Sequence, residues 1–182
     1  MCPMNNDFGS EAEIKRIIRN AADEFKVDAN LLLSIARAES NLNPQALGPM
    51  LHVMAKPQRA QGLFQFMYDT FEEMRAKIKP KLDDASIMNP VSSARCAAFY
   101  VSRLLKQFKQ NPVFVLAAYN WGMGNVERKI VVKRTIKNWL FKVVGEEYFM
   151  DSNAIFRMPG ETINYIRKIN SFYNEYTGHD LA

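Results

Sequence analysis

Residues 28–40 have the sequence DANLLLSIARAES, which predicts a helix with one face in the protein core. Asp28 can accept hydrogen bonds from the unpaired amides of the first turn, as helix N-caps do. Apolar residues then recur at the three- and four-residue spacing of a helix face, namely Leu31, Leu32, Ile35 and Ala36. We expect this helix to stop near Asn43-Pro44, because the residue before a proline is biased away from helical angles.

A carboxylate lies in line with this apolar face. Glu39 follows Leu32 by seven positions, which places both on one side of the helix. Partial burial and the negative end of the helix dipole would both raise the pKa of Glu39, and a carboxyl group protonated near neutral pH can act as a general acid. The alternative is a glutamate at a frayed helix end that turns to solvent. The helix alone favours that alternative, since buried carboxylates are rare.

The rest of the chain also predicts helices. Ser10 and Glu13 match a capping box that opens a helix ending at about Phe25. Further helical patterns cover residues 70–78, 91–108, 111–121 and 160–176. Residues 48–62 contain prolines and glycines and predict a long loop or insertion, and residues 131–148 are basic and aromatic. With no repeat and no convincing alternating strand, the predicted class is mostly α.

Size and charge limit the possibilities further. A chain of 182 residues with 48% hydrophobic and 24% charged residues fits one soluble domain. We place this domain at residues 11–178, with a flexible leader at 1–10 and a tail at 179–182. The net charge of +5 favours an anionic partner, such as nucleic acid, a membrane surface or an acidic cell-wall polymer. Charge alone does not choose among these partners.

The two cysteines do not predict a disulfide. Cys2 lies in the leader, far from Cys96 in the sequence, and we interpret Cys96 as a small packed residue on a helix. No apolar run approaches the ~18 residues that a membrane-spanning helix needs, and the N-terminus lacks the basic and apolar regions of a secretory signal. We therefore expect no transmembrane segment.

Four short blocks change the interpretation of Glu39. In order, they are Glu39-Ser40, Gly62-Leu63-Phe64-Gln65, Ala118-Tyr119-Asn120, and Pro159-Gly160-Glu161-Thr162 with Tyr165 nearby. Taken alone, Tyr119 fits a core tyrosine and Asn120 a helix terminator. Together, the blocks resemble the soluble-type lytic transglycosylases (SLT), whose catalytic domain is similar to goose-type lysozyme. The resemblance covers about residues 14–176.

The resemblance implies a mostly α, lysozyme-like (goose-type/SLT) domain with a central cleft, acting on peptidoglycan glycan strands. It implies that Glu39 protonates the glycosidic oxygen and then takes a proton from the 6-hydroxyl of muramic acid, giving a 1,6-anhydro sugar. It further assigns roles to seven residues. Tyr119 would orient Glu39, and Gln65 and Asn120 would line the sugar subsites. Ser40 would support the backbone after the glutamate, Glu161 and Tyr165 would lie beside the cleft, and Phe64, in place of the usual methionine, would contribute to substrate binding.

The sequence also departs from the family pattern. The serine usually found before the Gly-Leu pair is missing, and the lengthened loop offers Gly48 or Lys56 instead. No second catalytic carboxylate is evident, because Asp69, Glu72 and Glu73 have the spacing of a solvated helix face. A single-glutamate scheme therefore fits best, while a hydrolytic muramidase on the same fold stays open.

Other functional classes are weaker. A zinc peptidase would need a ligand cluster, but His52 and His179 are isolated, so we expect no metal and no cofactor. No motif supports specific nucleic-acid binding. A non-catalytic wall-binding module of a phage or secretion machine would keep the fold with an idle glutamate. We expect a monomer that acts on the periplasmic cell wall. Because no signal peptide is visible, we expect either that the chain has been trimmed or that a phage particle or another protein delivers it.

Overall fold

The computed structural model describes residues 9–51, 58–80, 86–131, 142–144, 147–150 and 154–181. The predicted leader lies almost wholly outside these residues, as do Cys2, His52 and Lys56. Contacts within the chain divide it into two compact units, Met1–Ser102 and Arg103–Ala182, with the boundary inside helix α4. The single domain over residues 11–178 stays a prediction.

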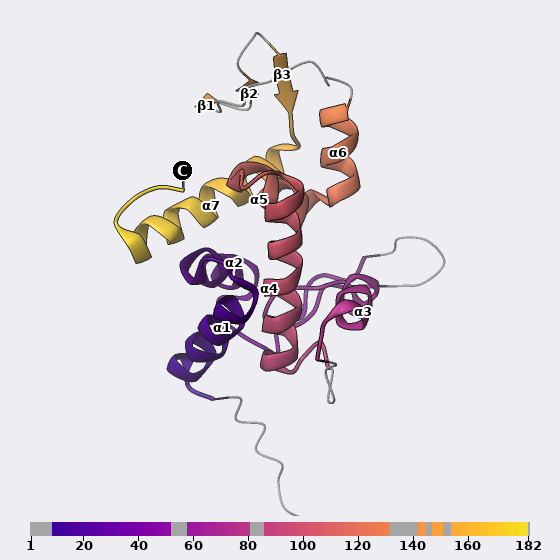
Figure 1. Ribbon diagram of the computed structural model, residues 1–182, viewed down its shortest axis with the longest axis vertical. Coiled ribbons are helices and arrows are strands. Elements are labelled where there is room, and N and C mark those ends of the chain that lie inside the picture. The colour runs from indigo at the N-terminus through magenta and orange to yellow at the C-terminus, as the bar shows by residue number, and fades with distance from the viewer. Residues whose placement is uncertain are drawn as a thin grey trace, which may run out of the picture. The chain divides into compact units, whose positions relative to one another are not determined.

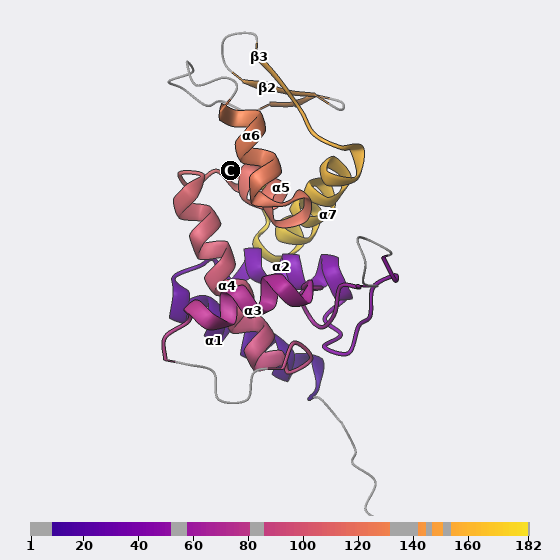
Figure 2. The ribbon, with the colours of Figure 1, turned by 90° about the vertical axis from the view of Figure 1, so that its right-hand side faces the viewer.

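The first unit is helical (Figures 1 and 2). It contains α1 (Glu11–Phe25), α2 (Ala29–Ser40), α3 (Tyr68–Lys77) and the first part of α4 (Pro90–Gln107). Helices α1 and α2 pack against each other through the apolar faces that the sequence predicts. A salt bridge of 2.6 Å between Arg95 and Glu24 connects α4 to α1. The helices predicted from periodicity are therefore confirmed, with boundaries shifted by one to three residues.

The caps of α1 and α2 explain where these helices begin. The Ser10 hydroxyl accepts a hydrogen bond from the Glu13 amide at 3.3 Å, as the capping box predicts. Asp28 accepts from the Asn30 amide at 2.8 Å and from the Leu31 amide at 3.4 Å. Each side chain satisfies amides that the first helical turn leaves unpaired.

The second unit contains the rest of α4, α5 (Pro112–Trp121), α6 (Met123–Val131), α7 (Gly160–Thr177) and a small sheet. Helices α5 and α7 lie side by side (Figures 1 and 2). Helix α6 was not predicted; it begins directly after Gly122, whose φ of 94° ends α5 and redirects the chain. The predicted tail is fixed as far as residue 181, because Asp180 accepts hydrogen bonds from Asn170 and Asn174.

The sheet corrects the expectation that the chain has no strand. Its strands are β1 (Lys142–Val144), β2 (Glu147–Met150) and β3 (Ala154–Arg157), antiparallel in the order β1-β2-β3. The register pairs Tyr148 with Val143 on one side and with Phe156 on the other. Strands of three or four residues are too short to show a clear alternation in the sequence. The fold is nevertheless mostly α, and none of the described helices is long and apolar enough to cross a membrane.

Cys96 is fully buried on α4, which confirms its interpretation as a packed residue. Burial disfavours the thiolate and raises the pKa of the Cys96 thiol to about 12, above its ordinary value of 9.0. Below pH 9 the thiol is therefore neutral in both the folded and the unfolded chain. As the pH rises from 9 towards 12, only the unfolded chain ionises, so the contribution of Cys96 to stability declines.

We predict that Cys96 resists thiol reagents while the protein is folded. A Cys2→Ser variant isolates the buried thiol, and a chromogenic disulfide reagent at about pH 8 should react with it only after guanidinium unfolding. Rapid stoichiometric reaction of the folded variant would show that Cys96 is accessible, contrary to its place in the core.

Candidate active site

The C-terminal end of α2 holds Glu39 in a defined position. The helix ends because Asn41 and Leu42 adopt positive φ angles of 53° and 64°. The Asn41 amide still donates to the Arg37 carbonyl at 3.1 Å, so the last turn is closed by a hydrogen bond. Glu39 lies in this closed turn and is half-buried. A frayed helix end, the alternative that the isolated helix favours, is therefore not what the structure contains.

Ser40 ties this helix end to the second sequence block. Its hydroxyl lies 2.8 Å from the Leu63 carbonyl oxygen and 3.1 Å from the Ala36 carbonyl oxygen. A hydroxyl has a single hydrogen to donate, and the shorter distance favours Leu63. The hydrogen bond brings together residues 23 positions apart in the sequence. Ser40 thus fixes the Gly62–Gln65 turn against the end of α2.

The Gly62–Gln65 turn requires its glycine. Gly62 has a φ of 76°, and a Cβ atom added there would lie 2.4 Å from the Ile87 carbonyl oxygen. Any other residue would have to displace the backbone. The turn closes with a hydrogen bond of 3.2 Å from the Gln65 amide to the Gly62 carbonyl. A glycine at this position is therefore a steric requirement of the fold as well as part of the motif.

The structure revises the role of Phe64. Its side chain is fully buried, with no exposed surface, and so is that of Leu63. A direct contact between Phe64 and a bound glycan does not fit this burial. The sequence could not reveal it, because an aromatic residue in a turn is compatible with both a binding surface and a core contact. Phe64 instead anchors the turn from the core side.

Gln65 uses both of its side-chain amide hydrogens in bonds to backbone carbonyls. Its Nε2 donates to the Gly62 carbonyl at 2.9 Å and to the Ala46 carbonyl at 3.2 Å. The remaining polar atom is Oε1, which would lie 3.0 Å from a Cβ atom added to Gly48. Gln65 is half-buried and can offer a ligand an acceptor, but its donors are engaged.

The segment before this turn is a loop held by backbone hydrogen bonds. Gly48 donates to the Ala60 carbonyl at 2.9 Å, and Leu51 and Gln58 exchange two backbone hydrogen bonds. The described parts of residues 46–61 therefore form the loop that the sequence predicts, with two isolated antiparallel bridges, Leu47 to Gln61 and Leu51 to Gln58. The pairing places Gly48, one of the two residues considered for the missing serine, beside Gln65. Lys56, the other, lies outside the described residues.

A second group of predicted residues lies on α5. The Asn111 side chain caps this helix by accepting from the Phe114 amide at 3.2 Å. Residues 114–118 of α5 are buried, whereas Tyr119 is half-buried and Asn120 is exposed. The helix continues to Trp121 and ends at Gly122, so Asn120 is not the helix terminator that it resembles in isolation.

The first turn of α7 meets Asn120 within the same unit. Thr162 is 1% exposed, and its hydroxyl donates to Asn120 Oδ1 at 2.9 Å. On the same turn and the next, Glu161 is exposed and Tyr165 is half-buried. The sequence placed Thr162 in a motif but gave it no role. Only the packing of α7 against α5 reveals its partner.

The other acidic residues considered near the site have cationic partners or face solvent. Glu72 forms a salt bridge of 2.6 Å with Arg75, and Glu73 pairs with Lys77 on the same face of α3. Asp69 is exposed. The prediction of a solvated helix face is confirmed for Asp69 and Glu73. Within the described residues, no group of three acidic, histidine or cysteine side chains is placed to hold a metal ion.

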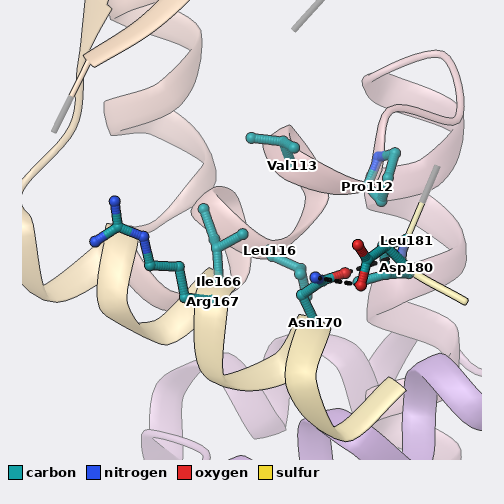
Figure 3. Close-up of a pocket in the computed structure, with 8 residues that line it drawn as sticks. All are labelled: Pro112, Val113, Leu116, Ile166, Arg167, Asn170, Asp180 and Leu181. Atoms are coloured by element: carbon teal, nitrogen blue, oxygen red, sulfur yellow. Dashed lines mark hydrogen bonds between the residues drawn. The ribbon is translucent and has the colours of Figure 1, made fainter. Parts of the chain in front are cut away.

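A separate pocket lies in the second unit between α5, α7 and the chain after α7 (Figure 3). Its volume is about 290 Å³, and Pro112, Leu116, Ile166 and Asn170 are among the residues that line it. None of the residues predicted from the sequence motifs lines this pocket. It is therefore distinct from the candidate site residues of this unit.

The fold is mostly α, with a half-buried glutamate and a hydrogen-bonded Gly-Leu-Phe-Gln turn in the first unit and a Tyr-Asn pair in the second. The family model described as the transglycosylase SLT domain matches residues 16–142, and the chain belongs to this family. The match includes Glu39, Gln65, Tyr119 and Asn120, whereas Glu161 lies beyond it.

Curated relatives are also similar in sequence. Membrane-bound lytic murein transglycosylase F of Hahella chejuensis is 24% identical, and the match covers 86% of this chain and 31% of the relative. Membrane-bound lytic murein transglycosylase C of Yersinia enterocolitica is 26% identical, over 90% of this chain and 46% of the relative. The chain thus spans less than half the length of either relative.

Solved structures share the fold. The 70 kDa soluble lytic transglycosylase of Escherichia coli matches with a TM-score of 0.62 and 19% identity, covering 91% of this chain and 24% of that one. An inactive mutant of the lytic transglycosylase Slt from Pseudomonas aeruginosa matches with a TM-score of 0.63 and 20% identity, covering 98% of this chain and 25% of that one. These matches confirm the predicted lysozyme-like SLT fold.

We predict that Ser40→Ala destabilises the protein by about 1–3 kcal/mol, because the buried Leu63 residue loses the partner of its carbonyl. Urea unfolding measures the change. Ser34→Ala is the matched control on α2, since the Ser34 hydroxyl bonds the Asn30 carbonyl of its own helix, at 2.7 Å. If both variants unfold at the same urea concentration, the Ser40–Leu63 bond does not hold the turn.

Proposed function

We propose that the protein is a peptidoglycan lytic transglycosylase that cleaves the β-1,4 bond between N-acetylmuramic acid and N-acetylglucosamine. The observation that carries this proposal is Glu39, which is half-buried in a closed helical turn and tied through Ser40 to the Gly62–Gln65 turn. Membership of the transglycosylase SLT domain family supports the reaction class. The names of the curated relatives agree with it.

Glu39 acts twice in the proposed reaction. As an acid it gives a proton to the glycosidic oxygen while the bond from muramic acid to that oxygen breaks. As a carboxylate it then accepts the proton of the muramic acid 6-hydroxyl, whose oxygen bonds to the anomeric carbon. The proton returns to Glu39 and no water is consumed, so the product is a 1,6-anhydro sugar. A single carboxylate suffices for both steps.

The other motif residues would hold the sugar and the glutamate. We assign Tyr119 to orienting Glu39 through its phenol, and Gln65 and Asn120 to the sugar subsites. Glu161 and Tyr165, on the first two turns of α7, would lie along the bound strand. Ser40 acts through the turn that it fixes, and Phe64 acts from the core; neither needs to touch the substrate.

The substrate also defines the place of action. Peptidoglycan lies in the periplasm, and the net charge of +5 favours an acidic wall polymer. Delivery by a phage particle or a secretion machine, and a monomeric state, stay predictions. The alternative reaction is hydrolysis by a muramidase, in which water attacks in place of the 6-hydroxyl. Glu72 and Glu73 of α3 each pair with a basic residue, so neither of these two carboxylates supports the hydrolytic alternative.

We predict that Glu39→Gln lowers the rate of peptidoglycan lysis by roughly a hundredfold to ten-thousandfold, because the amide cannot donate or accept the proton. Turbidity of outer-membrane-stripped cells measures the rate, and circular dichroism verifies folding. Glu73→Gln is the matched control: it removes an exposed carboxylate of the same unit and should leave lysis unchanged. Full lysis by the folded Glu39→Gln variant would refute the role of Glu39.

A further inference from the structure

Thr162 lies in the first turn of α7, where no carbonyl of its own helix precedes it by four residues. Its hydroxyl is buried and donates across to Asn120 Oδ1 on α5, at 2.9 Å. A helical threonine more often bonds a carbonyl of its own helix. Thr177, at the other end of α7, does so by donating to the Tyr173 carbonyl at 2.8 Å. Thr177 therefore provides a comparison whose hydroxyl bonds within its own helix, whereas the Thr162 hydroxyl bonds to another helix.

The Thr162 hydrogen bond determines what Asn120 can offer to a ligand. An asparagine amide carries one acceptor oxygen and two donor hydrogens, and these ends exchange when the side chain rotates by half a turn. Because Oδ1 accepts from the buried Thr162 hydroxyl, that oxygen stays on the protein side. Asn120 is exposed, so its amide nitrogen is the end that can meet a ligand. In the opposite orientation the Asn120 amide nitrogen would face Thr162, and the buried Thr162 hydroxyl would lose Oδ1 as its acceptor.

Gln65, in the first unit, offers a ligand an acceptor, whereas Asn120 offers a donor. Both of its amide hydrogens bond backbone carbonyls, which leaves Oε1 as the atom that can meet a ligand. Gln65 is thus fixed as an acceptor, whereas Asn120 in the second unit is fixed as a donor. N-acetyl sugars carry acetamido groups with both an N–H donor and a carbonyl acceptor, so each of these two side chains has the polarity to bond such a group.

We propose that Thr162 is a positioning residue that fixes Asn120 as a hydrogen-bond donor to the acetamido carbonyl of a bound N-acetyl sugar. The proposal rests on the proposed function, because it needs a glycan substrate. Thr162 itself does not contact the sugar. Its contribution is to the recognition of the acetyl group and hence to the selection of N-acetylated strands over deacetylated ones.

The test compares Thr162 variants on two substrates, purified glycan strands and the same strands after chemical de-N-acetylation. Thr162→Val removes the hydroxyl at nearly constant shape and should raise KM for N-acetylated strands roughly two- to tenfold, the value of one hydrogen bond, with kcat little changed. Thr162→Ser restores the hydroxyl and should restore KM. On de-N-acetylated strands, Thr162→Val and wild type should have the same KM, since the acceptor is missing.

Two further variants separate recognition from stability. Thr177→Val makes the same chemical change at the far end of α7 and should leave KM unchanged on both substrates. Asn120→Asp keeps an acceptor for Thr162 but removes the donor hydrogens, so it should raise KM as Thr162→Val does. A Thr162→Val variant with the KM of Thr177→Val, or one equally impaired on both substrates, would overturn the proposal. A wild type that cleaves neither substrate would overturn the proposed function itself.

Discussion

The hydrogen bond from the Ser40 hydroxyl to the Leu63 carbonyl joins the end of α2 to the Gly62–Gln65 turn, and the candidate site of the first unit depends on it. It can form only because Gly62 lets the turn approach the Ile87 carbonyl, where a Cβ atom would lie at 2.4 Å. Glu39 immediately precedes Ser40, so the same contact that holds the turn also fixes the helical turn that carries the proposed acid.

The sequence predicts the helices well because their determinants are local. Caps such as Ser10 and Asp28 and the apolar spacing of residues 91–108 are sufficient to place α1, α2 and α4. The isolated bridges of the loop at residues 46–61 and the sheet of β1 to β3 depend on backbone pairing, and helix α6 depends on the direction that the chain takes after Gly122. Such features leave little periodicity in the sequence, so the structure was needed to find them.

The candidate site shows the same division. The motif blocks identify Glu39, Gln65, Tyr119 and Asn120, and the family match covers all four. The sequence does not show that Phe64 is buried in the core or that both side-chain amide hydrogens of Gln65 bond backbone carbonyls. Nor does it show that Thr162 donates a hydrogen bond to Asn120 Oδ1. Each of these facts depends on the packing or hydrogen bonding of the folded chain, and each changes what the side chain can offer to a ligand. The hydrogen-bonding capacity of these side chains is therefore a property of the fold.

The central claim is that Glu39 is the only carboxylate needed, and that the 6-hydroxyl of muramic acid attacks the anomeric carbon in place of water. Mass spectrometry of peptidoglycan digested in heavy-oxygen water tests it most directly. The account predicts muramic acid termini in the 1,6-anhydro form that carry no heavy oxygen. Reducing muramic acid termini with one heavy oxygen each, and no anhydro form, would contradict it and show that the enzyme is a hydrolytic muramidase.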